Sequence, residues 1–563
     1  MMLKRPKARS LVVAFSLLSV LILILSACGP SGTPSTGGTT SGKPVHGGTW
    51  VDDLFEEPTS LIPLGSAETF ADIVDQTIWT ALFVGDSQGQ LHPGLASEIP
   101  TLANGDISAD LKTWTFKLKP NLKWSDGQPI TADDVDFSWR LWTNPKFGAA
   151  STLGYNLITS ADVSADKLSI TFHLKQAFEP FMTVWADGLQ APLPKHVFAS
   201  MAPDQVLKSS ENLKPSVASG PFMISESQLH DHYTVVKNPN YYRASEGLPY
   251  LDKIVFRIVA NDATILKDFQ SGAIDSAYFL DVSKTDTYKA ISGYHAVINP
   301  ISVNFEVSIF NFQNPILGKD LAVRKAIAMA IDHNTLIKTA RKGTATPQCT
   351  DHSKAFVPGY QADAACPKFD PAGANALLDQ DGWVKGSDGY RSKGGQKLEF
   401  KYSTTANKPW RDADELIIQS NLKDIGIKIN IQNYPASTYF GPFLNGGKHD
   451  IAEYENSWTY DADNASGWAC NQIPPNGSNW TWYCNPNLDK LFQQEEGSAD
   501  PAVRQDAFNK IHEIELTDFP FVVLYSPTDL SVAKNVVHNY LPSSEGAAET
   551  INNWEWWCDG GKC

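Results

Sequence analysis

The sequence predicts an α/β protein of two or three domains. Residues 112–140 alternate apolar and polar side chains and then change to the spacing of an amphipathic helix. Residues 398–431 have the pattern of a strand, a helix and a second strand, an order typical of a parallel unit with a right-handed crossover. The third observation is length, because 563 residues are too many for a single hydrophobic core.

The stretch KTWTFKLKPNLKWSDGQPITADDVDFSWR, residues 112–140, predicts a strand, a turn and a helix. Trp114, Phe116 and Leu118 fall on one face of the strand because side chains alternate along it. Ser125-Asp126-Gly127 is a turn pattern. Thr131 is placed to cap the helix, since its hydroxyl can accept from the amide of Asp134 and the acids there suit a helix start.

The string from Thr113 to Val135 resembles the signature of the extracytoplasmic solute-binding proteins of family 5, the large peptide, nickel and oligosaccharide receptors of bacterial ABC importers. Further stretches follow in family order along nearly the whole chain: 47–51, 91–96, 219–222, 237–242, 251–257 and 269–275. The resemblance implies a periplasmic-binding-protein-like fold of type II, cluster C. Such a fold has two lobes, an extra small domain and a hinge between the lobes.

The resemblance also implies how the chain is divided between these parts. Lobe I is expected to be discontinuous and lobe II continuous. The expected boundaries are 1–27 for a signal peptide, 28–46 for a tether, 47–90, 216–302 and 523–563 for lobe I, 91–215 for the small domain and 303–522 for lobe II.

The N-terminus has the pattern of an exported lipoprotein. Four cations within the first nine residues precede an apolar run over residues 11–25 and the sequence Leu25-Ser26-Ala27-Cys28. This pattern predicts a signal peptide, and the last four residues resemble a lipobox in which Cys28 is lipidated. An uncleaved membrane anchor is the alternative, but the run is shorter than a spanning helix needs. Residues 28–46, rich in Gly, Ser, Thr and Pro, predict a flexible tether.

Six cysteines remain after Cys28, and an even number in an exported chain favours disulfides. Proximity in sequence predicts the pairs Cys349–Cys366, Cys470–Cys484 and Cys558–Cys563. Metal ligation by cysteine is the alternative, but the spacing lacks a CxxC pattern. Likewise, His230-Asp231-His232 could suggest a metal site, but its position predicts a solvated hairpin turn.

Charge excludes some partners. The formal net charge is −16, and it is nearer −20 without the cationic signal peptide. A chain this acidic is a poor ligand for nucleic acid or for anionic lipid surfaces, so no nucleic-acid partner is expected. Aromatic residues make up 11% of the chain, including 16 Trp, and their faces could stack on sugar rings or simply form core.

The resemblance implies a ligand site in the segment 449–484. Peptide receptors of the family carry a Trp, two variable residues and an Asp there, and the Asp pairs with the α-ammonium of the ligand. Trp458-Thr459-Tyr460-Asp461 fits this spacing, although Asn464-Ala465 replaces the Asp-Pro that often follows and Asp463 is an alternative acid. Trp79 and Glu56 lie near other cleft positions of the family. The expected ligand-binding residues are therefore Trp458, Tyr460, Asp461, Trp79 and Glu56.

The function expected from the resemblance is that of a monomeric, lipid-anchored receptor outside the cytoplasm, which carries oligopeptides to the membrane subunits of an importer with a separate ATPase. No catalysis and no cofactor are expected, because the common hydrolase and nucleotide motifs are absent from the sequence. Oligosaccharide is the alternative ligand, and nickel is disfavoured for want of a His-rich cluster. A secreted hydrolase using Asp461 and Asp463 is the alternative from another class.

Overall fold

The computed structural model describes residues 43–563 except 87–88, 187, 299–301, 459 and 543–547. The predicted signal peptide, Cys28 and most of the predicted tether lie outside the described residues. Residues Pro44–Cys563 form one compact unit. Within the described ranges, no helix has the length and apolar character that crossing a membrane requires.

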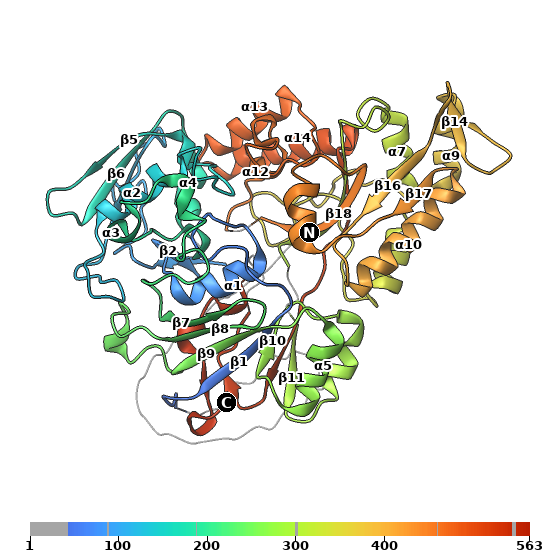
Figure 1. The fold of residues 1–563 in the computed structure, drawn as a ribbon. Coiled ribbons are helices and arrows are strands. Elements are labelled where there is room, and N and C mark those ends of the chain that lie inside the picture. The colour runs from blue at the N-terminus through green and yellow to red at the C-terminus, as the bar shows by residue number, and fades with distance from the viewer. Residues whose placement is uncertain (1–42, 87–88, 187, 299–301, 459, 543–547) are drawn as a thin grey trace, which may run out of the picture. The chain divides into compact units, whose positions relative to one another are not determined.

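The first sheet has seven strands in the order β11-β20-β10-β1-β9-β8-β7 (Figure 1). Its strands are β1 (Thr49–Leu54), β7 (Phe222–Gln228), β8 (His232–Lys237), β9 (Lys253–Ile258), β10 (Ser276–Ala277), β11 (Tyr294–Ile298) and β20 (Leu530–Lys534). β1 is parallel to both β9 and β10. The strands therefore come from all three segments that the sequence analysis assigns to lobe I, although the boundaries themselves stay a prediction.

Three helices come from the same chain segments as the first sheet: α1 (Thr69–Ile78), α5 (Asp262–Ser271) and α6 (Thr285–Lys289). α1 ends at Ile78 because Trp79 takes an extended conformation. The chain then forms a small hairpin of β2 (Phe83–Gly85) and β3 (Leu91–Pro93).

The family signature at residues 113–135 forms the predicted strand and the predicted capped helix. β4 (Thr113–Lys117) pairs with β6 (Ser169–Leu174), which pairs with β5 (Ile158–Val163). α2 (Ala132–Trp142) begins with a capping box, in which the Thr131 amide donates to Asp134 Oδ2 at 2.8 Å. Two short helices follow, α3 (Lys195–Phe198) and α4 (Pro203–Val206).

The second main sheet has five strands in the order β17-β16-β18-β12-β19. They are β12 (Asn304–Phe310), β16 (Glu399–Ser403), β17 (Lys428–Ile431), β18 (Ile451–Ser457) and β19 (Phe521–Tyr525). β16 and β17 are parallel and joined by α10 (Pro409–Asp424), so the predicted strand–helix–strand unit is confirmed. β19 pairs with β12, so residues 521–525 lie in the second sheet, while the predicted boundary 522/523 stays a prediction.

The remaining helices and strands all follow β12 in the chain. The helices are α7 (Leu321–Ala330), α8 (His333–Thr335), α9 (Pro371–Gln380), α11 (Ala436–Thr438), α12 (Ala465–Trp468), α13 (Pro486–Glu496) and α14 (Pro501–Asp518). The strands are β13 (Val384–Lys385), β14 (Arg391–Lys393), β15 (Gln396–Lys397), β21 (Val537–His538) and β22 (Trp557–Cys558). The structure has disulfides between Cys349 and Cys366, Cys470 and Cys484, and Cys558 and Cys563, the same pairs that sequence proximity predicts.

Two glutamates face each other inside the second sheet. Glu306 on β12 is directly opposite Glu455 on β18, and Glu306 is fully buried. Like charges placed opposite each other destabilise a sheet unless a cation lies between them. Arg411 of α10 supplies one, because its Nε donates to Glu306 Oε1 at 2.8 Å and its Nη1 to the Thr405 hydroxyl.

We predict that Arg411→Met destabilises the protein by about 3–5 kcal/mol, because it leaves Glu306 buried without its cation. The double variant Arg411→Met/Glu306→Gln should recover part of this loss, since the uncompensated charge is gone. Urea unfolding of the wild type, both single variants and the double variant measures the coupling. Strictly additive effects would show that the pair contributes nothing beyond the packing of each side chain.

Candidate ligand-binding site

The segment that the sequence analysis assigns to the ligand follows strand β18. The chain leaves β18 at Ser457, passes Trp458 to Asp461 and enters the short helix α12. The disulfide Cys470–Cys484 then closes a loop before α13. Each of the five predicted ligand residues can therefore be placed against its neighbours, whereas Thr459 between Trp458 and Tyr460 is not described.

Trp458 is packed into the interior. Only 5% of the residue is exposed, and its ring lies beside those of Phe305 and Trp468. Its indole N–H donates to Asp351 Oδ2 at 3.2 Å. Gly467 makes room for the ring, because a Cβ at that position would lie 2.6 Å from it. In this arrangement Trp458 packs in the core behind the segment, and its contact with a ligand stays a prediction.

Asp461 is held by an arginine that the sequence analysis did not identify. Arg504 of α14 donates Nη1 to Asp461 Oδ2 at 2.8 Å, and the same nitrogen donates to Glu179 Oε2 at 2.7 Å. Arg504 Nη2 also donates to Glu495 Oε2 at 2.8 Å. One guanidinium therefore joins three carboxylates, one of them from the segment predicted to be the small domain.

The acids around Arg504 outnumber the cation. Burial, followed by the charge of Asp461, raises the pKa of Glu179 to about 7, and Arg504 only partly offsets this effect. Burial raises the pKa of Asp463 to about 6, and burial with the charge of Asp463 raises the pKa of Glu496 to about 9. This part of the site therefore has carboxyls that take up protons more readily than exposed acids do.

Tyr460 and Trp79 line one small cavity, together with Gly85, Tyr242 and Trp554. Tyr460 lies so close to Gly85 that a Cβ there would be 2.3 Å from its ring, so the contact requires glycine at position 85. Trp79 is 2% exposed and donates its indole N–H to the Leu61 carbonyl at 2.9 Å. Two of the five predicted ligand residues thus share a cavity. Trp79 follows α1 and Tyr460 follows β18, so segments far apart in the chain line this cavity.

Glu56 lies apart from that cavity and near a buried lysine. Burial raises the pKa of Glu56, while the charge of Lys408 lowers it. The Lys408 ammonium is 3.4 Å from the centre of the Phe55 ring and 4.4 Å from that of Phe279, so aromatic faces stabilise its charge. Burial lowers the pKa of Lys408 to about 8, and its Nζ has no hydrogen-bond partner among the described residues.

The structure therefore places the five predicted residues in four separate settings: Trp458 in the core, Asp461 on Arg504, Tyr460 with Trp79 at the cavity, and Glu56 near Lys408. Sequence reasoning missed Arg504, Lys408 and Glu179. A helical arginine and a loop lysine look like solvated surface residues in the sequence, and only the tertiary contacts reveal their burial.

The raised pKa of Glu179 makes the stability of the protein depend on pH. For an acid whose pKa is higher in the folded state, the stabilisation is complete below the ordinary value of 4.5 and is lost as pH rises through about 7. We predict that unfolding between pH 5 and pH 8 becomes easier and that Glu179→Gln removes about 1–2 kcal/mol of this pH dependence, a value reduced for the partial exposure of the side chain.

Chemical denaturation at pH 5 and pH 8 measures this effect. Glu98→Gln is the matched control, because Glu98 belongs to an exposed ion pair with Lys117. An unchanged pH dependence in Glu179→Gln, or an equal change in the control, would contradict the assignment.

Comparison with known proteins identifies the family of this chain. Residues 90–488 match the description "Bacterial extracellular solute-binding proteins, family 5 Middle". The chain is 25% identical over 578 residues to the oligopeptide-binding protein AppA of Bacillus subtilis, and the alignment covers 98% of this chain and 99% of that protein.

Solved structures show the same fold. The structure of AppA from Bacillus subtilis in complex with a nonapeptide has a TM-score of 0.83 at 22% identity, covering 92% of this chain and 100% of that one. NikZ from Campylobacter jejuni in complex with Ni(L-His) has a TM-score of 0.81 at 22% identity, covering 90% of this chain and 99% of that one. The chain therefore belongs to the bacterial extracellular solute-binding proteins of family 5 and has their two-lobed, type II periplasmic-binding fold.

Proposed function

We propose that this protein is the receptor of an ABC importer and that it binds oligopeptides between its two lobes. The observation that carries the proposal is the similarity to an oligopeptide-binding protein along 98% of the chain, which includes both main sheets. The protein delivers its ligand to membrane subunits that use a separate ATPase. It makes and breaks no bond, and it acts outside the cytoplasm as a monomer.

Closure of the lobes is the proposed mechanism. A ligand shifts the equilibrium toward the closed state only if it binds that state more strongly, which contacts to both lobes would achieve. Two contacts support this proposal, because they join segments far apart in the chain. They are the ion pair of Arg504 with Glu179 and the packing of Tyr460 on Gly85.

The proposed anchor for the ligand's ammonium is Asp461, and Arg504 changes what this requires. In the structure both oxygens of Asp461 accept from Arg504, so an incoming ammonium has to share this carboxylate with the guanidinium or displace it. Displacement is feasible because Arg504 keeps Glu495 and Glu179 as partners. Asp463, whose Oδ1 accepts from the Ala465 amide, is the alternative acid.

We predict that the wild type binds free peptides and discriminates strongly against N-acetylated ones, and that Asp461→Asn loses most of this discrimination. Removing one partner of a desolvated ion pair costs about 3–5 kcal/mol, so affinity for free peptides should fall a hundredfold or more. Isothermal titration with each peptide and its acetylated form measures both quantities, and native mass spectrometry of freshly purified protein identifies the length of peptide to use.

Asp463→Asn is the matched control. If it, and not Asp461→Asn, abolishes the discrimination, then Asp463 is the anchor. Equal binding of free and acetylated peptides by the wild type would rule out an ammonium anchor altogether. Binding of oligosaccharides without any binding of peptides would overturn the proposed function itself.

The proposed attachment to the membrane is a lipid on Cys28, with residues 1–27 removed. The charged start, the short apolar run and the Leu-Ser-Ala-Cys sequence support it. We predict that Cys28→Ser releases the protein from the membrane fraction, because no acyl chain can then be added. Fractionation followed by mass spectrometry of the N-terminus measures this, and unchanged membrane retention of an unlipidated chain would contradict it.

A further inference from the structure

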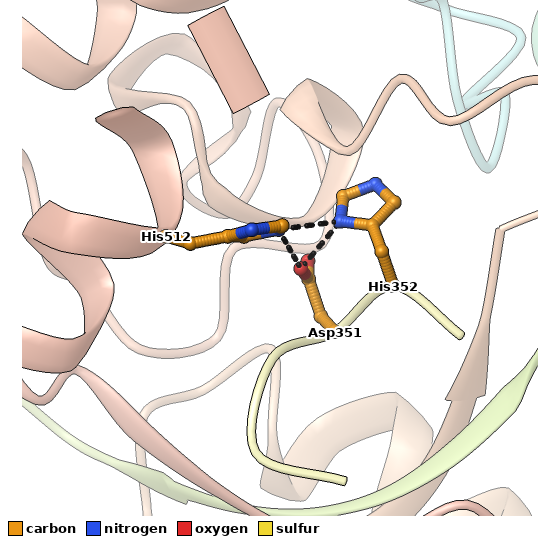
Figure 2. A group of neighbouring side chains, drawn as sticks. All are labelled: Asp351, His352 and His512. Carbon is orange, nitrogen blue, oxygen red and sulfur yellow. Dashed lines mark hydrogen bonds and ion pairs between the residues drawn. The ribbon is translucent and has the colours of Figure 1, made fainter. Parts of the chain in front are cut away.

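Three buried side chains in the second part of the molecule converge on one point. Asp351 and His352 lie between Cys349 and Cys366, and His512 lies on α14 (Figure 2). His352 Nδ1 is 2.9 Å from both Asp351 Oδ1 and His512 Nε2, and His512 Nε2 is 3.6 Å from Asp351 Oδ1. All three residues are completely buried.

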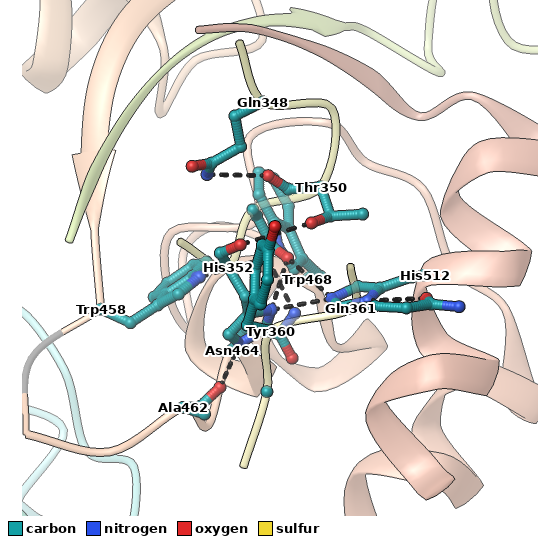
Figure 3. Close-up of polar contacts among 12 residues, drawn as sticks. Gln348, Thr350, His352, Tyr360, Gln361, Trp458, Ala462, Asn464, Trp468 and His512 are labelled. Atoms are coloured by element: carbon teal, nitrogen blue, oxygen red, sulfur yellow. Dashed lines mark hydrogen bonds and ion pairs between the residues drawn. The ribbon is translucent and has the colours of Figure 1, made fainter. Parts of the chain in front are cut away.

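The contacts on the outer side of each group fix which atoms carry protons. His352 Nε2 lies 2.6 Å from the Ala462 carbonyl, so this nitrogen must carry a proton to donate. His512 Nδ1 lies 3.3 Å from Gln361 Oε1, and with the amide in this orientation it is the donor. Figure 3 shows these outer contacts. In the neutral rings, the lone pairs of His352 Nδ1 and His512 Nε2 then face inward.

Asp351 is oriented in the same way. Its Oδ2 accepts three hydrogen bonds, from the indoles of Trp458 and Trp468 and from the amide of Asn464, at 3.2, 2.7 and 2.8 Å. Three donors on one oxygen favour an ionised carboxylate. The other oxygen, Oδ1, is left to face the two imidazoles.

Three lone pairs at such short distances repel one another unless a positive charge lies among them. Ligands at about 2.0–2.1 Å from a tetrahedral zinc ion are about 3.3–3.4 Å apart, and the separations of 2.9, 2.9 and 3.6 Å lie on both sides of that value. The carbonyl, amide and indole contacts behind the three groups are the outer partners that orient metal ligands in proteins.

We propose that Asp351, His352 and His512 bind a divalent transition-metal ion, and that zinc is the ion that fits best. Two imidazoles and one carboxylate are ligands that zinc favours, and the absence of thiolate from the set disfavours softer ions. The ion would be a resident structural one, because the site is buried in the interior and a transported solute has to leave. The proposed metal site does not require that the protein binds peptides.

Glu515 provides a second observation that points to a cation at this site. It lies one turn beyond His512 on α14 and is 2% exposed, and neither of its oxygens has a hydrogen-bond partner among the described residues. Burial, and after it the charge of Asp351, raises the pKa of Glu515. A divalent ion at the neighbouring site would offset the negative charge that these two acids bring into the interior.

The site would connect the metal to the proposed ligand segment. Asp351 contacts Trp458, Asn464 and Trp468, and His352 contacts Ala462, so four residues of that segment lie against metal ligands. An ion that holds the 349–366 loop against α14 would therefore also fix the position of the chain segment that contains Asp461.

The test is metal analysis of the mature chain, residues 28–563, exported so that its disulfides form. We expect about one zinc ion per chain by inductively coupled plasma mass spectrometry, either as purified or after unfolding with EDTA and refolding with zinc chloride. His512→Gln should lower the zinc content at least tenfold. Zinc should also raise the Tm of the refolded wild type by several degrees and leave that of His512→Gln unchanged.

His449→Gln is the matched control, because His449 is a buried histidine of the same part of the chain whose Nε2 bonds to the Trp480 carbonyl at 3.0 Å. It should keep its zinc. If His512→Gln does not fold, X-ray absorption on the zinc-loaded wild type decides, since it should show nitrogen and oxygen neighbours with imidazole scattering and no sulfur. Less than about 0.1 transition-metal ion per wild-type chain after both treatments would overturn the proposal and leave a shared proton as the buried cation. Equal zinc in the wild type and in folded His512→Gln would also overturn it.

Discussion

The second sheet depends on the buried cation of Arg411, which compensates a carboxylate on its central strand β12. All seven residues of β12 are buried, and one of them, Glu306, faces Glu455 of β18. Arg411 binds Glu306, and Asn304 donates to both Glu455 and Asp529. Because an uncompensated charge in the interior costs several kcal/mol, α10 has to pack where its arginine reaches β12. This requirement fixes the helix on the sheet and, with it, the loop that carries Lys408.

The need to compensate buried charge also acts where Arg504 of α14 meets Glu179. Arg504 is 4% exposed and compensates Asp461, Glu495 and Glu179, of which Glu179 comes from a distant segment. A contact of this kind is strong when it is closed and dry, but its partners are easily solvated when it opens. It is therefore suited to the lobe closure that we propose for this protein. Lys408 differs, because aromatic rings rather than carboxylates hold its ammonium.

Asp351 links the interior of the second part to the proposed ligand segment. Its two oxygens have different tasks: Oδ2 holds two indoles and an amide, while Oδ1 faces the two histidines. Trp458 is therefore buried for a reason that its family position does not indicate. Its indole is one of the groups that orient the carboxylate, so the ring supports the site from behind.

The sequence by itself determined the α/β class, the capped helix after Thr131, the parallel unit around α10 and three cysteine pairs that the structure also joins. These features rest on local spacing, and local spacing is visible in the chain. Only the tertiary structure decided that Asp461 meets Arg504, that Trp458 is core, and that His352 and His512, 160 residues apart, lie 2.9 Å from each other. Such partners come together through sheet order and helix packing, and a single sequence has no period that records them. His230-Asp231-His232, the cluster that is visible in the sequence, lies at the hairpin between β7 and β8, as its position predicts, with His232 already in β8.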